Sequence, residues 1–173
     1  MTASHFDDTH NLARKKYYLD LRARLIQNIR LYFINHDFLE VETPLRIPAP
    51  APEEHIEAIP SAEWFLQTSP ELCMKRLVAA GYPRIFQICK CFRDAERGNM
   101  HLPEFTMLEW YVSGFNYFRL IEQCENMLIE VLNNMGCEEK IIWQNRNINL
   151  AHPWEKITVA EAFSRYAKIS CDQ

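Results

Sequence analysis

Two strand-like runs joined by a polar loop constrain the fold of this chain more than any other feature. The first run is Ile85–Phe92 and the second is Glu104–Val112, with the polar stretch 94–103 between them. Two such runs joined by a largely polar loop predict an antiparallel hairpin. The hairpin would bring the end of its first strand and the start of its second strand to one mouth.

The predicted hairpin has two chemically different faces, because successive side chains of a strand point to opposite sides. Thr106, Leu108 and Trp110 share a face that suits a core under helices. The other face contains an acid and a phenol, and a carboxylate among large side chains is costly unless it meets a cation. Its members are Phe105, Met107, Glu109 and Tyr111, with Gln87, Cys89, Cys91 and Arg93 on the first strand. On this pattern alone, a surface ion pair between Arg93 and Glu109 is the plainest interpretation.

The rest of the chain predicts helices and short strands without βαβ alternation, which indicates an α+β fold. Apolar spacing and capping residues predict helices over Tyr18–Tyr32, from Ser69-Pro70-Glu71 to Gly81, over Tyr117–Val131, and from the capping box at Thr158 to Ala167. Strands are expected over residues 38–43, ended by Pro44, and over 64–68. We expect a flexible arm over residues 1–14 and one compact domain over 15–173.

Composition excludes several classes of protein. The chain has 19 Lys+Arg against 23 Asp+Glu, so its net charge of −4 lacks the basic excess typical of nucleic-acid binders. It has no run of 18 apolar residues and no export signal at its N-terminus, which predicts a cytoplasmic protein that does not span a membrane. The six cysteines are then expected to be thiols. No metal site is predicted, because Cys89 and Cys91 form the only close pair and zinc needs two more ligands.

Three ordered segments resemble the class II aminoacyl-tRNA synthetases, in their lysine branch. FRDAERGNMHLPEFTMLEWY is similar to the motif 2 hairpin of that family, FLEVETP to motif 1, and TSPELCMKRL to the amino-acid-binding segment. The short arm before the motif 1 helix and the phrase PEFTMLEWY resemble most closely the elongation factor P lysine ligases, a shortened branch of the lysyl-tRNA synthetases. The resemblance covers about residues 15–168 and implies an antiparallel sheet flanked by helices.

The resemblance implies a nucleotide site at the mouth of the hairpin. Arg93 matches the catalytic arginine that holds the ATP α-phosphate and the substrate carboxylate, where a fixed guanidinium stabilises the charge that develops. His101 matches the loop residue near the terminal phosphates, and Phe105 matches the ring that stacks on adenine. Asp94 and Ala95 are also placed at the nucleotide. Ala95 stands where the family has a glutamate, which here comes one residue later as Glu96.

The resemblance also implies a site for lysine. Glu71, with the neighbouring Ser69, matches the segment that holds the α-amino group of the substrate. Glu109 and Tyr111 match the pair that reads the far amino group. A buried carboxylate with a phenol suits a lysine reader, because a neutral or shorter substrate leaves the carboxylate unpaired.

The implied activity is ATP-dependent activation of lysine or β-lysine and its transfer to a lysine of elongation factor P. A lysyl-tRNA synthetase fragment that acts on tRNA is an alternative, and a non-catalytic paralogue that acts as a binding module is another. Motif 3 and the carboxylates that hold magnesium have no counterpart before Gln173, so we expect a chain truncated before motif 3 with weak activity or none. Motif 1 implies a homodimer.

Overall fold

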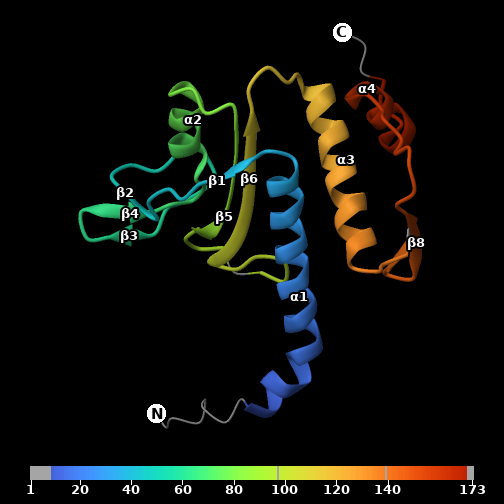
Figure 1. The fold of residues 1–173 in the computed structure, drawn as a ribbon, viewed down its shortest axis with the longest axis horizontal. Coiled ribbons are helices and arrows are strands. Elements are labelled where there is room, and N and C mark those ends of the chain that lie inside the picture. The colour runs from blue at the N-terminus through green and yellow to red at the C-terminus, as the bar shows by residue number, and fades with distance from the viewer. Residues whose placement is uncertain (1–8, 97, 139, 171–173) are drawn as a thin grey trace. The chain divides into compact units, whose positions relative to one another are not determined.

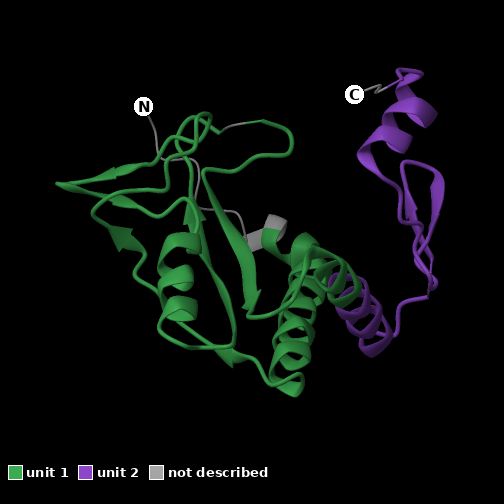
Figure 2. Cartoon of the chain, turned by 90° about the horizontal axis from the view of Figure 1, so that it is seen from above, with its two compact units in different colours: residues 1–123 green, residues 124–173 purple. Residues whose placement is uncertain are grey.

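The computed structural model describes residues 9–96, 98–138 and 140–170 and divides the chain into two compact units, residues 1–123 and 124–173 (Figure 2). The length predicted one compact domain, but the residues after the middle of helix α3 contact mainly one another. The elements are α1 Thr9–Asn35, β1 Leu39–Glu40, β2 Arg46–Ile47, β3 Pro60–Ser61, β4 Trp64–Leu66, α2 Glu71–Ala79, β5 Arg84–Phe92, β6 Glu104–Val112, α3 Tyr117–Asn134, β7 Lys140–Trp143, β8 Arg146–Asn149, α4 Val159–Ala162 and a π-helical turn Phe163–Ala167 (Figure 1).

The predicted hairpin is the centre of the first unit. Strands β5 and β6 pair antiparallel along their whole length, from Arg84 opposite Val112 to Phe92 opposite Glu104. The sheet order is β1-β5-β6, and β1 pairs parallel to β5. The expected antiparallel pairing is confirmed for β5 and β6. Strand β1 instead adds to the sheet in parallel, because the chain crosses over through β2–β4 and α2 before it returns as β5. The strand predicted over 38–43 is also shorter, since only Leu39 and Glu40 pair with β5.

Helix α1 covers the apolar face of the hairpin and forms the core of the unit. The Phe33 ring stacks on Phe86 at 4.8 Å between centroids and lies 5.4 Å from Trp110. Phe33 and Phe86 are fully buried, as the strand alternation predicted for this face. The helix begins at Thr9, so the arm expected over residues 1–14 is wrong for 9–14, where Leu12, Ala13 and Arg14 are good helix formers. Residues 1–8 lie outside the described residues.

Helix α2 lies on the other face of the hairpin, next to the predicted site residues. Its Met74 side chain is fully buried. The helix stops before Gly81, whose φ of +100° and N–H bond to Val78 make the predicted left-handed cap. Its start differs by one residue from the prediction, because Pro70 and not Ser69 occupies the cap position. The Ser69 hydroxyl still accepts the Glu71 N–H at 3.1 Å.

The second unit contains the end of α3, a hairpin and a short helix. The hairpin β7–β8 was not predicted, although Gln144 and Asn145 form a two-residue turn with positive φ that is typical of tight hairpins. The capping box at Thr158 is confirmed: its Oγ1 accepts the Glu161 N–H, while the Glu161 carboxylate accepts the Thr158 N–H. No helix within the described ranges is long and apolar enough to span a bilayer.

Candidate functional site

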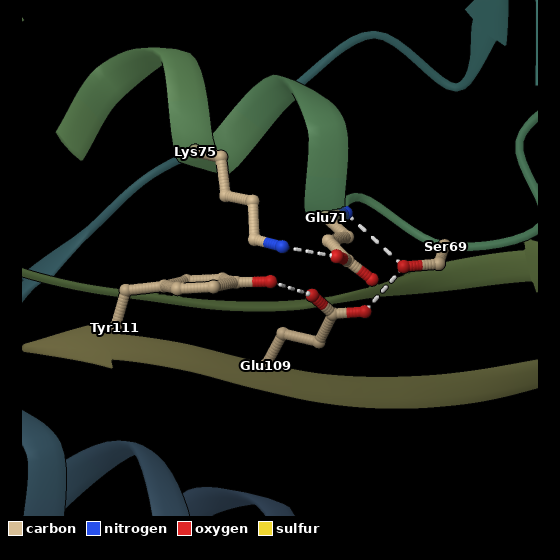
Figure 3. A network of polar contacts seen from close by, with 5 residues as sticks. All are labelled: Ser69, Glu71, Lys75, Glu109 and Tyr111. Atoms are coloured by element: carbon tan, nitrogen blue, oxygen red, sulfur yellow. Dashed lines mark hydrogen bonds and ion pairs between the residues drawn. The ribbon is translucent and has the colours of Figure 1, made fainter. Parts of the chain in front are cut away.

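The predicted lysine-reading residues meet in one hydrogen-bonded network in the first unit (Figure 3). The Ser69 hydroxyl donates to Glu109 Oε1 at 2.5 Å, and the Tyr111 hydroxyl donates to Glu109 Oε2 at 2.8 Å. Glu109 and Tyr111 come from β6, and Ser69 comes from the segment that leads into α2. The network thus fixes both carboxylate oxygens of Glu109 with donors from two separate elements.

Glu109 has two neutral donors and no cationic partner among the residues that the structure describes. The surface ion pair with Arg93 considered above is not formed, since Arg93 has Glu96 as its nearest acid, at 4.0 Å. Burial and the hydrogen bond to Glu109 raise the pKa of Tyr111 above its ordinary value, so its phenol remains a donor at neutral pH. A half-buried carboxylate held in this way is suited to bind an ammonium group.

Glu71 lies beside this network at the start of α2. Together with Glu109 and Tyr111 it lines a hollow of about 270 Å³. Its carboxylate accepts an ion-pair hydrogen bond from Lys75, one turn further along the helix (Figure 3). Sequence reasoning did not single out Lys75, although acid and base four residues apart on a helix are a recognised pairing signal.

The predicted nucleotide residues Arg93, His101 and Phe105 line a second cavity, of about 280 Å³. The Arg93 guanidinium lies over the Phe105 ring, 5.1 Å from its centroid. Arg93 Nε is buried and has no hydrogen-bond partner within the described part of the chain. Glu96 is the one acid among the residues that line this cavity. A cation over an aromatic ring, with a donor unused, is a suitable arrangement for a phosphate and a planar base.

Asp94 and Ala95 do not line that cavity, so the structure does not bring them together with the other nucleotide residues. The Asp94 carboxylate accepts the Ala95 N–H at 2.8 Å, and the Asp94 N–H donates to the Glu57 carbonyl. Ala95 has a φ of +57°, and this left-handed residue turns the chain so that Glu96 lines the cavity instead. The sequence showed that Glu96 stands one residue after the position where the family has its glutamate, but it did not predict this turn. Met100 and Leu102 also line the cavity.

Between the two ends of this hairpin face lie the sulfur atoms of Cys89, Cys91 and Met107. Cys89 is paired with Met107 across the strands, and Cys91 lies two residues along β5 on the same face. The described residues contain no group of three His, Cys, Asp or Glu side chains that could hold a metal ion.

Residues 5–172 match the family model of the class II tRNA synthetases (D, K and N). The chain is 35% identical over 151 residues to a lysine–tRNA ligase of Azoarcus sp., covering 84% of this chain and 30% of that protein. It is 34% identical over 169 residues to an elongation factor P–(R)-β-lysine ligase of Pseudoalteromonas translucida, and the match covers 90% of this chain and 50% of that protein. A ligase with the same name from Actinobacillus succinogenes is 43% identical over 122 residues, 65% of this chain and 38% of that protein. The chain therefore spans half or less of the length of these relatives.

Proposed function

The chain belongs to the class II tRNA synthetases (D, K and N), and from this premise we propose that it carries the amino-acid and nucleotide subsites of an ATP-dependent lysine ligase. In this reaction the carboxylate of lysine attacks the α-phosphorus of ATP, which releases pyrophosphate and leaves an aminoacyl adenylate. An acceptor amine or hydroxyl then attacks the acyl carbon, and AMP leaves. A reaction of this kind in translation would place the protein in the cytoplasm.

The observation that carries this proposal is the environment of Glu109. Its two oxygens are held by Ser69 and Tyr111, and no cation of the described chain neutralises it. The terminal ammonium of lysine or β-lysine supplies the missing charge and can donate to the lone pairs that Ser69 and Tyr111 leave free. Glu71, two residues after Ser69, is placed to accept from the second amino group of the substrate.

Arg93 and Phe105 serve the other half of the reaction. The Phe105 ring offers a face for adenine, and the Arg93 guanidinium offers charge for the α-phosphate. Because the Nε donor of Arg93 is buried without a partner, a phosphate oxygen or a substrate carboxylate would satisfy it. The cavity that these residues line therefore favours a nucleotide at the hairpin mouth.

We propose a lysine of elongation factor P as the acceptor. Two of the relatives named above are elongation factor P–(R)-β-lysine ligases, and the net charge of −4 does not favour a polyanion as partner. Transfer to tRNA is the second candidate, because a lysine–tRNA ligase matches 84% of this chain. The acceptor assay that separates them offers the lysyl adenylate of the full-length protein to each acceptor in turn.

We also propose a homodimer through α1, several of whose large apolar side chains remain exposed. Tyr17, Tyr18, Leu25 and Leu31 are between 37% and 70% exposed. An isologous contact along this helix would cover them. Sedimentation at tens of micromolar protein should show a dimer, and a monomer alone would exclude this interface.

Calorimetric titration of the folded chain tests the two subsites separately. Glu109→Gln is nearly isosteric and should weaken lysine binding by roughly 10- to 150-fold, the loss of a charge-assisted bond, while ATP binding is unchanged. Arg93→Ala should abolish ATP binding and leave lysine binding intact. Glu104→Gln on the same strand and Arg46→Ala are the matched controls, because neither lines either cavity.

The opposite pattern would contradict the proposal. If Glu109→Gln lowers the melting temperature while lysine binding is preserved, Glu109 is a structural residue and does not read lysine. If wild type and Arg93→Ala bind ATP equally, the hairpin mouth carries no nucleotide site.

A further inference from the structure

Three sulfur atoms are close together on the site face of the β5–β6 hairpin. Cys89 Sγ and Cys91 Sγ are 3.9 Å apart, and Cys91 Sγ is 3.8 Å from Met107 Sδ. Both cysteines are free thiols. Cys91 is fully buried, whereas Cys89 and Met107 are half-buried. The cluster is therefore buried on its inner side and partly accessible to solvent on its outer side.

We propose that Cys89, Cys91 and Met107 bind a soft monovalent metal ion, with Cu(I) as the expected occupant. A metal–sulfur bond of about 2.3 Å places the ligands of a planar three-coordinate ion about 4 Å apart, which agrees with the 3.9 Å between the two thiols and the 3.8 Å from Cys91 Sγ to Met107 Sδ. Thiolate and thioether ligands select Cu(I) over harder ions. Each thiol that binds the ion releases its proton to solvent.

A direct disulfide does not suit this pair. Cys89 and Cys91 are two residues apart on one regular strand, and two strand rises separate their Cα atoms by about 6.6 Å. That separation is at the upper end of what a disulfide spans, and β5 continues through this position with its pairing to β6 intact. An ion between the two sulfur atoms bridges the same gap without bending the strand.

Zinc does not suit the cluster either. A structural zinc site takes four ligands from Cys, His and acidic side chains, and the described residues contain no group of three such side chains. The third ligand here is the thioether of Met107, which is not among the ligands of structural zinc sites. Cys89 also lines a cavity of about 560 Å³ at the edge of β5, which gives an ion a route to the cluster.

Anaerobic titration of the chain with Cu(I), buffered by bicinchoninate, tests the proposal. We expect one ion per chain and a charge-transfer absorbance typical of copper–thiolate bonds. Cys89→Ser and Cys91→Ser should each weaken binding by at least about 100-fold, and Met107→Leu by about 10-fold. Cys137→Ser is the matched control, because that exposed thiol lies in the other unit. X-ray absorption should show three sulfur neighbours around the copper.

Binding that persists in Cys89→Ser, or that falls equally in Cys137→Ser, would overturn the site. A disulfide between Cys89 and Cys91 in protein purified without reductant, found by mass spectrometry, would also overturn it. If Cys91→Ser fails to fold, Cys89→Ser and Met107→Leu decide the question, because both of those side chains are half-exposed. These measurements need neither ATP nor lysine, so their outcome is independent of the proposed ligase function.

Discussion

The two ends of the site face of the β5–β6 hairpin differ in how far the chain satisfies its own polar groups. At the end that we propose binds lysine, called the lysine end below, both oxygens of Glu109 are held by hydroxyl donors. At the end that we propose binds the nucleotide, called the nucleotide end below, the guanidinium of Arg93 has a buried Nε without a partner in the described residues and an acid no closer than 4.0 Å. The carboxylate of Glu109 is thus held in place by the chain itself, whereas the Nε donor of Arg93 is left without an acceptor among the described residues.

This difference agrees with the ligand that we propose for each end. A carboxylate that selects an ammonium group needs fixed geometry, and neutral donors fix it without cancelling its charge. A guanidinium that stabilises charge developing on phosphorus must keep its donors free until the substrate is in place. We therefore expect the lysine end to stabilise the fold, and the nucleotide end to contribute nothing to stability or to reduce it.

The largest expected effect comes from opening the lysine end. Ser69→Ala removes the donor to Glu109 and the acceptor of the Glu71 N–H, so the free energy of unfolding should fall by about 1–3 kcal/mol. Urea unfolding measures this change, with Ser113→Ala, an exposed position, as control. An unchanged midpoint would show that the network adds nothing to stability and would end the contrast between the two ends.

A smaller effect is expected from Tyr111→Phe, which removes one neutral donor and should cost about 0.5–1.5 kcal/mol at neutral pH. The pKa of Tyr111 is raised in the folded chain, so the folded state holds this proton more tightly than the unfolded state does. Its contribution is therefore complete below the ordinary tyrosine pKa of 10.0 and is lost as the pH rises above it.

Unfolding of wild type and Tyr111→Phe at neutral pH and above pH 10 measures this contribution. The gap between the two proteins should narrow at the higher pH, and Tyr82→Phe, which is 44% exposed, should show no such change. A gap that stays constant with pH would mean that the phenol proton is not held by Glu109.

The smallest effect is expected at the nucleotide end, with the opposite sign. Arg93→Met removes a buried, unsatisfied donor and also the contact with the Phe105 ring, so stability should stay constant or rise by up to about 1 kcal/mol. Thermal unfolding detects this change. A loss larger than about 1 kcal/mol would show that Arg93 is a structural residue and that both ends of the hairpin are built alike.

Sequence reasoning predicted the hairpin, its two faces and the residues that meet on each. These features depend on the period of the strand, and the register that pairs Gln87 with Glu109 and Cys91 with Phe105 follows once the loop is placed. The helices over Glu71–Ala79 and Tyr117–Asn134 were predictable because proline, glycine and an apolar stripe define them locally.

The features that sequence reasoning missed depend on contacts between distant segments or on one backbone angle. The parallel pairing of β1 with β5 joins residues on either side of α2, and no local pattern encodes it. Glu96 lines the proposed nucleotide cavity because Ala95 has a positive φ, and an alanine in the sequence does not predict this left-handed conformation. The β7–β8 hairpin had a signal in its turn at Gln144 and Asn145, but its strands have no buried face to strengthen it.

The parallel pairing of β1 with β5 also bears on the order in which the fold assembles. The β5–β6 hairpin closes a short loop and can form early, whereas β1 must reach β5 across residues 41–83, at a greater cost in chain entropy. Glu109 and Tyr111 are then in register before Ser69 arrives with α2. We expect changes within the hairpin to slow folding, and changes at Ser69 mainly to speed unfolding. The end of the site that contains Ser69 would thus be completed only after the hairpin that carries Glu109 and Tyr111 has formed.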